Sequence, residues 1–165
     1  RRIKEGMCLV DEWEAHSGPI WKVDFAHPQF GQVIATAAES GEVFVWEEKI
    51  KRKPGTSHEM IKQWDKMASL KVSKEKIQDI KFGPEHVGLK LLVLYKNGCI
   101  SAYQAKIVTK LDKWEQVANL GWINTNGCNS VDWNPDENTD MFVVASNANK
   151  VSDSNLDDVQ DYESN

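Results

Sequence analysis

The amino-acid sequence predicts an all-β fold, an incomplete β-propeller of about three four-stranded blades and one orphan strand. One reason is that a single template of alternating apolar and polar residues occurs three times along the 165 residues. Another is that apolar residues at helical spacing are scarce, apart from a doubtful stretch at 58–67. A β-sandwich of short strands is the alternative, but the gapless match of glycines between copies favours repeated blades.

The first copy of the template contains three strand patterns separated by turn residues. Trp21, Val23 and Phe25 alternate with polar residues, which is the period of a strand. A nearly continuous apolar run with small residues follows and suits a strand buried on both faces. Gly41 then supplies the positive φ that a tight hairpin turn needs. The strands predicted from this copy are 20–25, 33–38 and 41–46.

The second and third copies follow at fixed offsets from the first. A shift of 57 residues places Phe25 on Phe82, and a shift of 108 residues places it on Trp133. The second copy carries Asn97-Gly98 at its turn, one of the strongest short signals for a hairpin. The strands predicted from these two copies are 77–82, 90–95, 98–103, 128–133 and 141–146.

Segments with a tryptophan and alternating apolar residues lie between the copies, at 64–72 and 114–120, and are interpreted as fourth strands. A similar segment at 7–13 is interpreted as the outer strand of a preceding blade. The last residues are acidic and poor in apolar side chains, which is typical of a disordered tail. The predicted boundaries are 1–13 for the end of a preceding blade, 14–72 and 73–121 for two blades, 122–151 for a partial blade and 152–165 for the tail.

The first copy also resembles a WD repeat. In that family a histidine before the first strand, an aspartate in the hairpin turn and a tryptophan that ends the third strand form a buried polar link. His16 and Trp46 stand at two of these places, whereas the turn holds Glu39-Ser40, so we expect an incomplete or altered link. The second copy ends in Tyr103, and the third has no closing aromatic residue.

A narrower resemblance lies in the loop that follows the first strand of each copy. Residues 16–36, with their Ala-His-Pro and Phe-Gly loop, resemble the WD-repeat propellers shared by the Y-shaped nuclear pore coat and the outer coat of COPII vesicles. Residues 77–93 repeat the loop style, and 126–135 match the third such strand. The endings at Trp46 and Tyr103 favour the nucleoporin member, while Pro19 and Cys128 favour the COPII member.

This resemblance implies a non-enzymatic scaffold protein. Such propellers form an open ring that accepts a blade from an α-solenoid partner, an arrangement in which a partner covers exposed sheet edges and apolar faces. The implied place is the nuclear pore coat at the nuclear envelope, with other coat subunits as partners. The family also occurs in a coat-like complex on lysosomal or vacuolar membranes that regulates signalling to the TOR kinase. The alternative is a COPII-type coat propeller for export from the endoplasmic reticulum.

Composition is consistent with this interpretation. The formal net charge of −5 argues against nucleic acid as a direct ligand, and no run of 18 apolar residues or signal peptide is visible. The cysteines Cys8, Cys99 and Cys128 have neither metal-ligand spacing nor an even number, which favours a reducing compartment. Because the first residue is Arg1 and three blades are too few to close a ring, we expect a piece of a longer propeller.

We expect no catalytic, cofactor-binding or metal-ligating residues, and the sequence alone leaves the partner-binding residues unknown. No two of the four histidines are spaced as ligands on one element, and we interpret them as structural; they are His16, His27, His58 and His86. Asp24 and Asp132 share one template position, and Asp79 takes the place of Lys22. With no nucleophile or base beside them, these carboxylates are interpreted as polar faces of strands.

Residues 49–53 form a short basic run between a third and a fourth strand. Such a run can act as a nuclear localisation signal or contact anionic lipid. The alternative that we favour from its position is an exposed loop.

Overall fold

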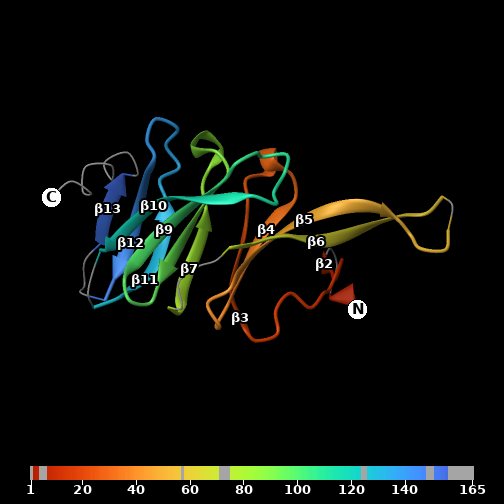
Figure 1. Ribbon diagram of the computed structural model, residues 1–165, viewed down its shortest axis with the longest axis horizontal. Helices are drawn as coiled ribbons and strands as arrows, with labels where there is room; N and C mark the ends of the chain where they lie inside the picture. The colour runs from red at the N-terminus through yellow and green to blue at the C-terminus, as the bar shows by residue number, and fades with distance from the viewer. Residues whose placement is uncertain are drawn as a thin grey trace.

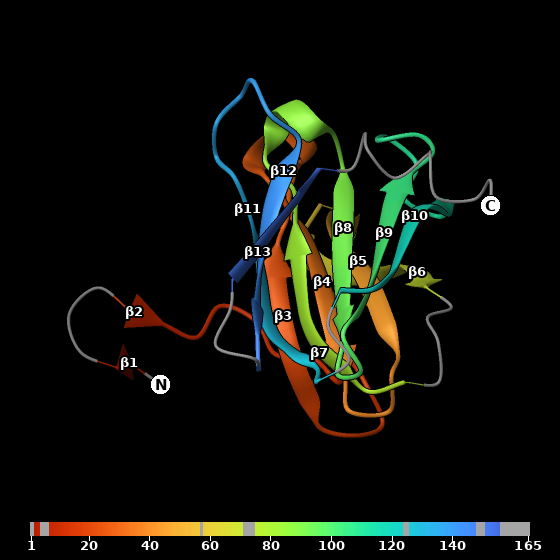
Figure 2. The same cartoon turned by 90° about the vertical axis from the view of Figure 1, so that its left-hand side faces the viewer.

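The computed structural model describes residues 2–3, 7–56, 58–70, 75–123, 126–147 and 151–155, and over these it is an arc of antiparallel sheets (Figure 1). Each sheet contains strands in sequence order, and the sheets face one another along the arc (Figure 2). The first holds β3 (Ile20–Phe25), β4 (Val33–Ala38), β5 (Val43–Arg52) and β6 (Met60–Leu70). The second holds β7 (Ile77–Phe82), β8 (Lys90–Tyr95), β9 (Cys99–Ala105) and β10 (Trp114–Trp122). The third holds β11 (Cys128–Trp133), β12 (Met141–Ser146) and β13 (Val151–Asn155).

This arrangement is an incomplete β-propeller, as the repeat predicted. Six strand predictions agree with the observed bounds: 20–25, 33–38, 77–82, 90–95, 128–133 and 141–146. The apolar core lies between the sheets. Val33, Ala35 and Val45 of the first sheet pack with Ile80 and Leu91 of the second in one cluster. The other face of the second sheet and the third sheet form a second cluster, which includes Leu92, Leu94, Trp133, Phe142 and Val144. Among the described residues, no helix is long and apolar enough to cross a membrane.

The inner strands β3, β7 and β11 each begin with a β-bulge at the same template position. Ile20 pairs with Ala38 and Lys22 with Ala37, so Trp21 has no opposite residue. The same skip occurs at Gln78 in β7 and at Asn129 in β11. The 57- and 108-residue offsets found in the sequence therefore extend to the local irregularities of the backbone.

The loops after β3 and β7 also share their geometry. Each contains one 3-10 turn, at Pro28–Phe30 and at Glu85–Val87, and each turn ends at a glycine with positive φ. Gly31 has φ 86° and Gly88 has φ 77°, values that side chains with a Cβ rarely adopt. The matching glycines in the sequence are thus required by the way the chain leaves each turn.

A buried hydroxyl completes the polar link that the sequence left open. Thr36 Oγ1 accepts a hydrogen bond from Trp46 Nε1 at 2.9 Å and lies 2.8 Å from His16 Nε2. His16 stacks on Phe44 with ring centroids 4.3 Å apart. Burial lowers the pKa of His16, which favours the neutral form of the ring. The expected altered link is therefore a His16–Thr36–Trp46 chain without the turn aspartate.

Three expectations about chain segments are wrong. Residues 152–155 belong to β13 rather than to a disordered tail, because their main chain pairs with β12 from Met141↔Asn155 to Ala145↔Val151. Residues 156–165 lie outside the described part of the chain. The orphan strand predicted at 7–13 is also not observed.

Only Met7–Cys8 is extended in that segment, as strand β2, and it pairs with β1 (Arg2–Ile3) instead of with a blade. Trp13 lies against the first sheet, stacked on Trp64 at 5.3 Å and tilted against Trp46 at 5.8 Å. Packing of this one large aromatic side chain accounts for the course of the segment across the sheet.

The third correction concerns the basic run at 49–53, which is not a loop. Its first four residues continue β5 to Arg52, and they pair with β6 from Lys49↔Gln63 to Arg52↔Met60. Lys51 pairs with Asp65 and Lys62 with Glu48 between the two strands, and such pairs support the ladder beyond the body of the sheet. The two strands form a long hairpin that projects from the arc (Figure 1).

The Thr36 link is expected to matter for stability. Thr36→Val removes the hydroxyl, leaves the buried Trp46 N–H without an acceptor and should lower the free energy of unfolding by about 1–3 kcal/mol. Thr36→Ser keeps the hydroxyl and should lose only the methyl group, about 1 kcal/mol. Urea denaturation of the two variants measures the difference. Because valine conserves the side-chain volume, an unchanged free energy of unfolding in Thr36→Val would show that the hydroxyl link contributes nothing to stability.

Candidate functional site at the inner strands

Two rows of polar side chains cross the inner strands β3, β7 and β11. In the first row, Lys22 Nζ lies 3.3 Å from Asp79 Oδ1, and Asp79 Oδ2 accepts a 2.8 Å hydrogen bond from Ser130 Oγ. In the second row, Lys81 Nζ lies 3.9 Å from Asp24 and 3.7 Å from Asp132. Charge alternates across all three strands in the second row, whereas the first row places a lysine, an aspartate and a neutral serine side by side. We call these side chains the inner polar rows.

Two of the carboxylates also hold the main chain of the neighbouring inner strand. Asp24 Oδ2 accepts a hydrogen bond from the Phe82 amide at 2.7 Å, and Asp79 Oδ2 accepts one from the Val131 amide at 3.1 Å. Because these amides face the gap between sheets and not a ladder partner, the aspartates satisfy donors that burial would otherwise leave unpaired. Each sheet thus fixes the next through a side chain of its own inner strand.

The carboxylates Asp24 and Asp79 of the two rows have different electrostatic surroundings. Burial raises the pKa of Asp24, while the Phe82 amide and the Lys81 ammonium act in the opposite direction. The ionised form of Asp24 is therefore less stable in the folded chain than in water. Asp79 is 7% exposed and has four partners, which are Lys22, Ser130 and the amides of Ile80 and Val131.

The sequence located the aspartates of these rows but missed the cluster. Asp24, Asp79 and Asp132 do form polar faces of strands, as expected. What alternation within one strand could not reveal is that Lys22 and Lys81 pair with them across two sheets. The available signal was the exchange of Lys and Asp between copies, since Asp79 takes the place of Lys22 and Lys81 that of Asp24.

A shallow depression lies where the inner strands end. Phe25, Phe82 and Trp133 close β3, β7 and β11, and the space of about 230 Å³ beside them is also lined by His27, Gly83, Pro84, Asp132 and Pro135. Trp133 donates a 3.3 Å hydrogen bond to the Lys81 carbonyl. A methyl group at Gly83 would come within 2.3 Å of Val87 Cγ2 and 3.4 Å of the Trp133 ring. The loops around the depression are therefore closely packed.

Three of the four histidines make hydrogen bonds that hold loops or strands together. His27 Nδ1 accepts a 3.4 Å hydrogen bond from the Gln29 amide within its own loop. His86 Nε2 lies 3.0 Å from the Thr139 carbonyl and so joins the loops after β7 and β11. His16 belongs to the Thr36 link, and His58 lies in the projecting hairpin. Across the described ranges, no three His, Cys, Asp or Glu side chains are grouped to hold a metal ion.

The outward face of β3 is apolar and uncovered among the described residues. Trp21 is 56% exposed, and Val23 and Phe25 are both 62% exposed. Their polar neighbours Lys22 and Asp24 point to the second sheet instead. We call Trp21, Val23 and Phe25 the β3 strip. Because the apolar side of β3 points away from the arc, this strand is suited to pack against a further sheet.

Comparison with curated proteins identifies relatives over nearly the whole chain. Nucleoporin SEH1 of Osmerus mordax is 31% identical over 160 residues, which cover 93% of this chain and 42% of the relative. The chain is a sequence relative of the SEH1 nucleoporins. Nucleoporin SEH1 of Homo sapiens is 33% identical over 126 residues, or 74% of this chain and 33% of the relative. The chain thus spans about two fifths of the length of the first of these SEH1 relatives.

Solved structures agree with the fold of this SEH1 relative. Sqt1 of Chaetomium thermophilum, bound to the N-terminus of the ribosomal protein L10, superposes with a TM-score of 0.64 at 15% identity, over 89% of this chain and 35% of that chain. Sqt1 of Saccharomyces cerevisiae gives 0.61 at 16% identity, over 85% and 36%. At such identities the likeness shows the propeller fold alone. No protein-family model matches the chain.

The raised pKa of Asp24 predicts a pH-dependent effect. A carboxyl whose pKa is higher in the folded than in the unfolded state destabilises the fold once pH exceeds the unfolded value, and this loss disappears as pH falls below it. Asp24→Asn keeps an acceptor for the Phe82 amide, so we expect it to raise the melting temperature at neutral pH and to lose that advantage in acid. Thermal melts across pH test this, with Asp132→Asn, at an exposed carboxylate, as control. A gain that persists unchanged in acid would contradict the assignment.

The β3 strip predicts self-association. Isolated in solution, the chain should sediment as oligomers, because the exposed strip gains by burial against a second apolar surface. Replacing Trp21, Val23 and Phe25 with serine should shift the population towards monomer in sedimentation velocity. The matched control is serine at Ile107 and Val108, which are exposed elsewhere. A monomeric parent chain would overturn this prediction.

Proposed function

We propose that the chain is part of a non-enzymatic propeller scaffold of the nuclear pore coat, located at the nuclear envelope. The observation that carries the proposal is the 31% identity to nucleoporin SEH1 along 93% of the chain. The rigid linkage of the sheets supports a scaffold role, because the inner polar rows and the apolar clusters fix each sheet against its neighbour.

The proposal includes an α-solenoid coat subunit that donates a blade to the open ring, beside other coat subunits. Its physical support is the β3 strip and the 41% exposed Val143 at the opposite end of the arc. Both are apolar positions on sheets with no further sheet beside them among the described residues. Further blades of the protein or a donated blade would supply the apolar surface that covers these faces.

The proposal extends to a second location and has one alternative. A coat-like complex on lysosomal or vacuolar membranes that regulates TOR signalling would be a second assembly of the same scaffold. A COPII-type coat for export from the endoplasmic reticulum is the alternative, which Pro19 and Cys128 favour at the sequence level.

The experiment is to express the full protein that contains this chain with a fluorescent tag and to purify it with its bound subunits. We expect a nuclear-rim signal and co-purification of an α-solenoid nucleoporin. Serine at the three positions of the β3 strip should reduce recovery of intact protein or its subunits, whereas serine at Ile107 and Val108 should not. Signal at endoplasmic-reticulum exit sites with a COPII solenoid, and none at the rim, would replace the proposal with the COPII alternative.

A further inference from the structure

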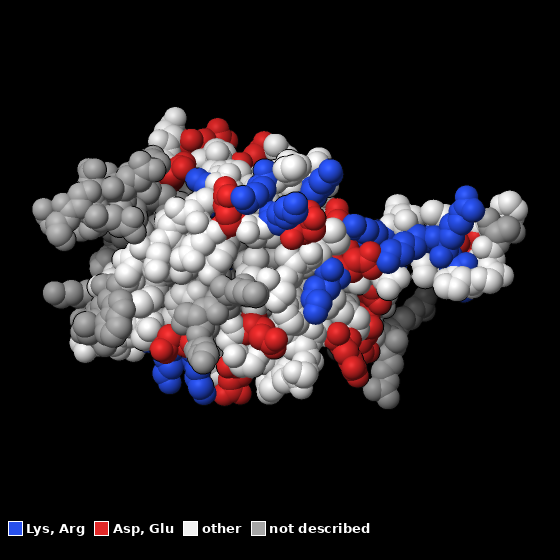
Figure 3. Space-filling view, in the orientation of Figure 1, with Lys and Arg blue, Asp and Glu red and all other residues white. Residues whose placement is uncertain are grey.

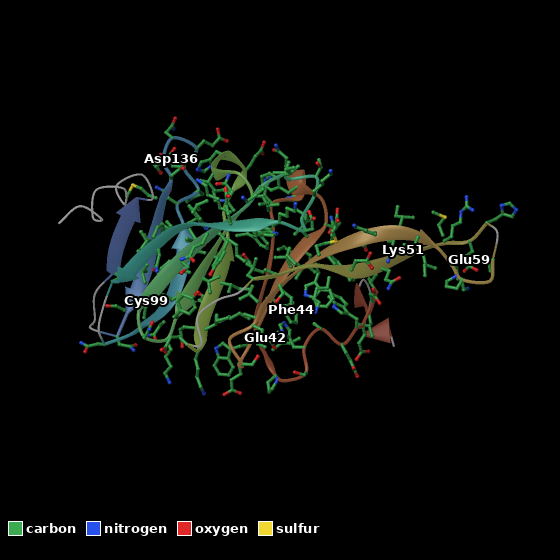
Figure 4. All side chains as sticks on the ribbon, viewed as in Figure 1. Glu42, Phe44, Lys51, Glu59, Cys99 and Asp136 are labelled. Atoms are coloured by element: carbon green, nitrogen blue, oxygen red, sulfur yellow. The ribbon has the colours of Figure 1, made fainter. Side chains whose placement is uncertain are left out.

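The long β5–β6 hairpin extends away from the packed sheets. Its outer part, residues 47–65, continues the ladder from Glu47↔Asp65 to Arg52↔Met60, and we call it the hairpin arm. Burial falls along β5 from the fully buried Val45 to the exposed Ile50. Figure 4 shows Lys51 and Glu59 on the arm, well away from Glu42 and Phe44 at its base. Beyond Lys49, β5 is exposed, so the outer end of the arm is a two-stranded ribbon that reaches into solvent.

The register assigns the arm side chains to two different faces. Residues that pair across an antiparallel ladder share a face, and neighbours along a strand alternate. Lys49 and Lys51 thus lie on one face. Ile50, Arg52, Met60 and Lys62 lie on the other, which we call the tip face. On the tip face, Ile50 is 65% exposed and Met60 is 55% exposed.

The outer arm is basic although the chain is acidic. Residues 49–63, at the outer end of the arm, contain five Lys and Arg and one carboxylate, a net charge of +4 with His58 neutral; the whole arm, which adds Glu47, Glu48 and Asp65, has a net charge of +1, against −5 for the whole chain. Blue side chains follow the arm in Figure 3. The cations of this segment are Lys49, Lys51, Arg52, Lys53 and Lys62.

Ion pairs within the arm reduce this charge without removing it. Glu47 pairs with Lys49 at 3.2 Å, Asp65 with Lys51 at 2.6 Å and Glu59 with Lys53 at 2.8 Å. Lys62 pairs with Glu48 at 2.8 Å. The four paired lysines are 38–64% exposed, and exposed ion pairs of this kind contribute little to stability. A more strongly anionic surface can therefore replace these carboxylates as the partner of the lysines.

The shape of the arm favours a flat partner over a concave one. A two-stranded ribbon without a core is marginally stable by itself, so the exposed apolar side chains gain by contact with another phase. The outer end of the arm presents two isolated apolar side chains, Ile50 and Met60, among cations. This combination of a basic surface with protruding apolar groups matches the interface of an anionic bilayer.

We propose that the hairpin arm is a peripheral contact site for anionic phospholipid membrane. Ile50 and Met60 enter the headgroup region, and Arg52 and Lys62 of the same face lie over lipid phosphates and carboxylates, with Lys53 beside them at the end of the ladder. Several cations near such a surface together outweigh the exposed ion pairs that they exchange.

Vesicle flotation of the whole chain tests the proposal. The probes are vesicles of phosphatidylcholine alone and vesicles of equimolar phosphatidylcholine and phosphatidylserine. We expect binding only to the phosphatidylserine vesicles, weakened by added salt. Glutamine at Arg52, Lys53 and Lys62 should reduce the partition coefficient about 100-fold. Glutamine at Lys76, Lys96 and Lys110 removes the same charge from the body and should leave most of the binding.

The apolar part of the proposal has its own test. Serine at Ile50 and Met60 leaves the charge unchanged and should reduce partition about tenfold or more. Serine at Ile107 and Val108 is the matched control. Thermal melts of all variants exclude loss of fold as the cause.

Three outcomes would overturn the proposal. One is no binding to phosphatidylserine vesicles, and another is equal loss in the arm and body glutamine variants. The third is binding that depends on the cations but not on Ile50 and Met60, because this would indicate a general polyanion surface such as that for nucleic acid.

Discussion

The carboxylate of Asp79 connects all three sheets of the arc. It lies beside Lys22 of the first sheet and accepts hydrogen bonds from Ser130 and the Val131 amide of the third. A side chain with so many partners and 7% exposure cannot shift without breaking several contacts at once. The angle between neighbouring sheets, and with it the apolar packing on either side, depends on this position.

The first and second sheets stabilise their second strands in different ways. In β4 the hydroxyl of Thr36 joins His16 and Trp46, whereas the equivalent position in β8 is the fully buried Val93. A polar link specifies one arrangement of neighbouring side chains, and an apolar contact tolerates several of similar volume. The first sheet, whose outward side is the least covered, contains the more specific of the two.

The inner and second strands of each sheet could be predicted from the sequence because the pattern of apolar residues that marks them lies within each strand. The sequence was insufficient for β13, whose serine and aspartate residues carry no strand signal and pair only because β12 offers a free edge. It was insufficient at 7–13 as well, since alternation cannot distinguish a strand from a segment held by Trp13 on Trp64. The inner polar rows depend on contacts between residues more than fifty positions apart, which no single-strand pattern contains. The hairpin arm required the ladder register before its faces could be distinguished.

The bulges at Trp21, Gln78 and Asn129 have a consequence for how such repeats tolerate changes in length. Each bulge lies at the entrance of an inner strand, between the connecting segment and the polar positions that face the next sheet. One unpaired residue there lets the preceding connection vary by a residue while the later positions keep their side of the sheet. A deletion beyond the bulge would instead turn Asp24 outwards and Phe25 inwards. Homologous repeats should therefore gain and lose residues before this point and conserve their spacing after it.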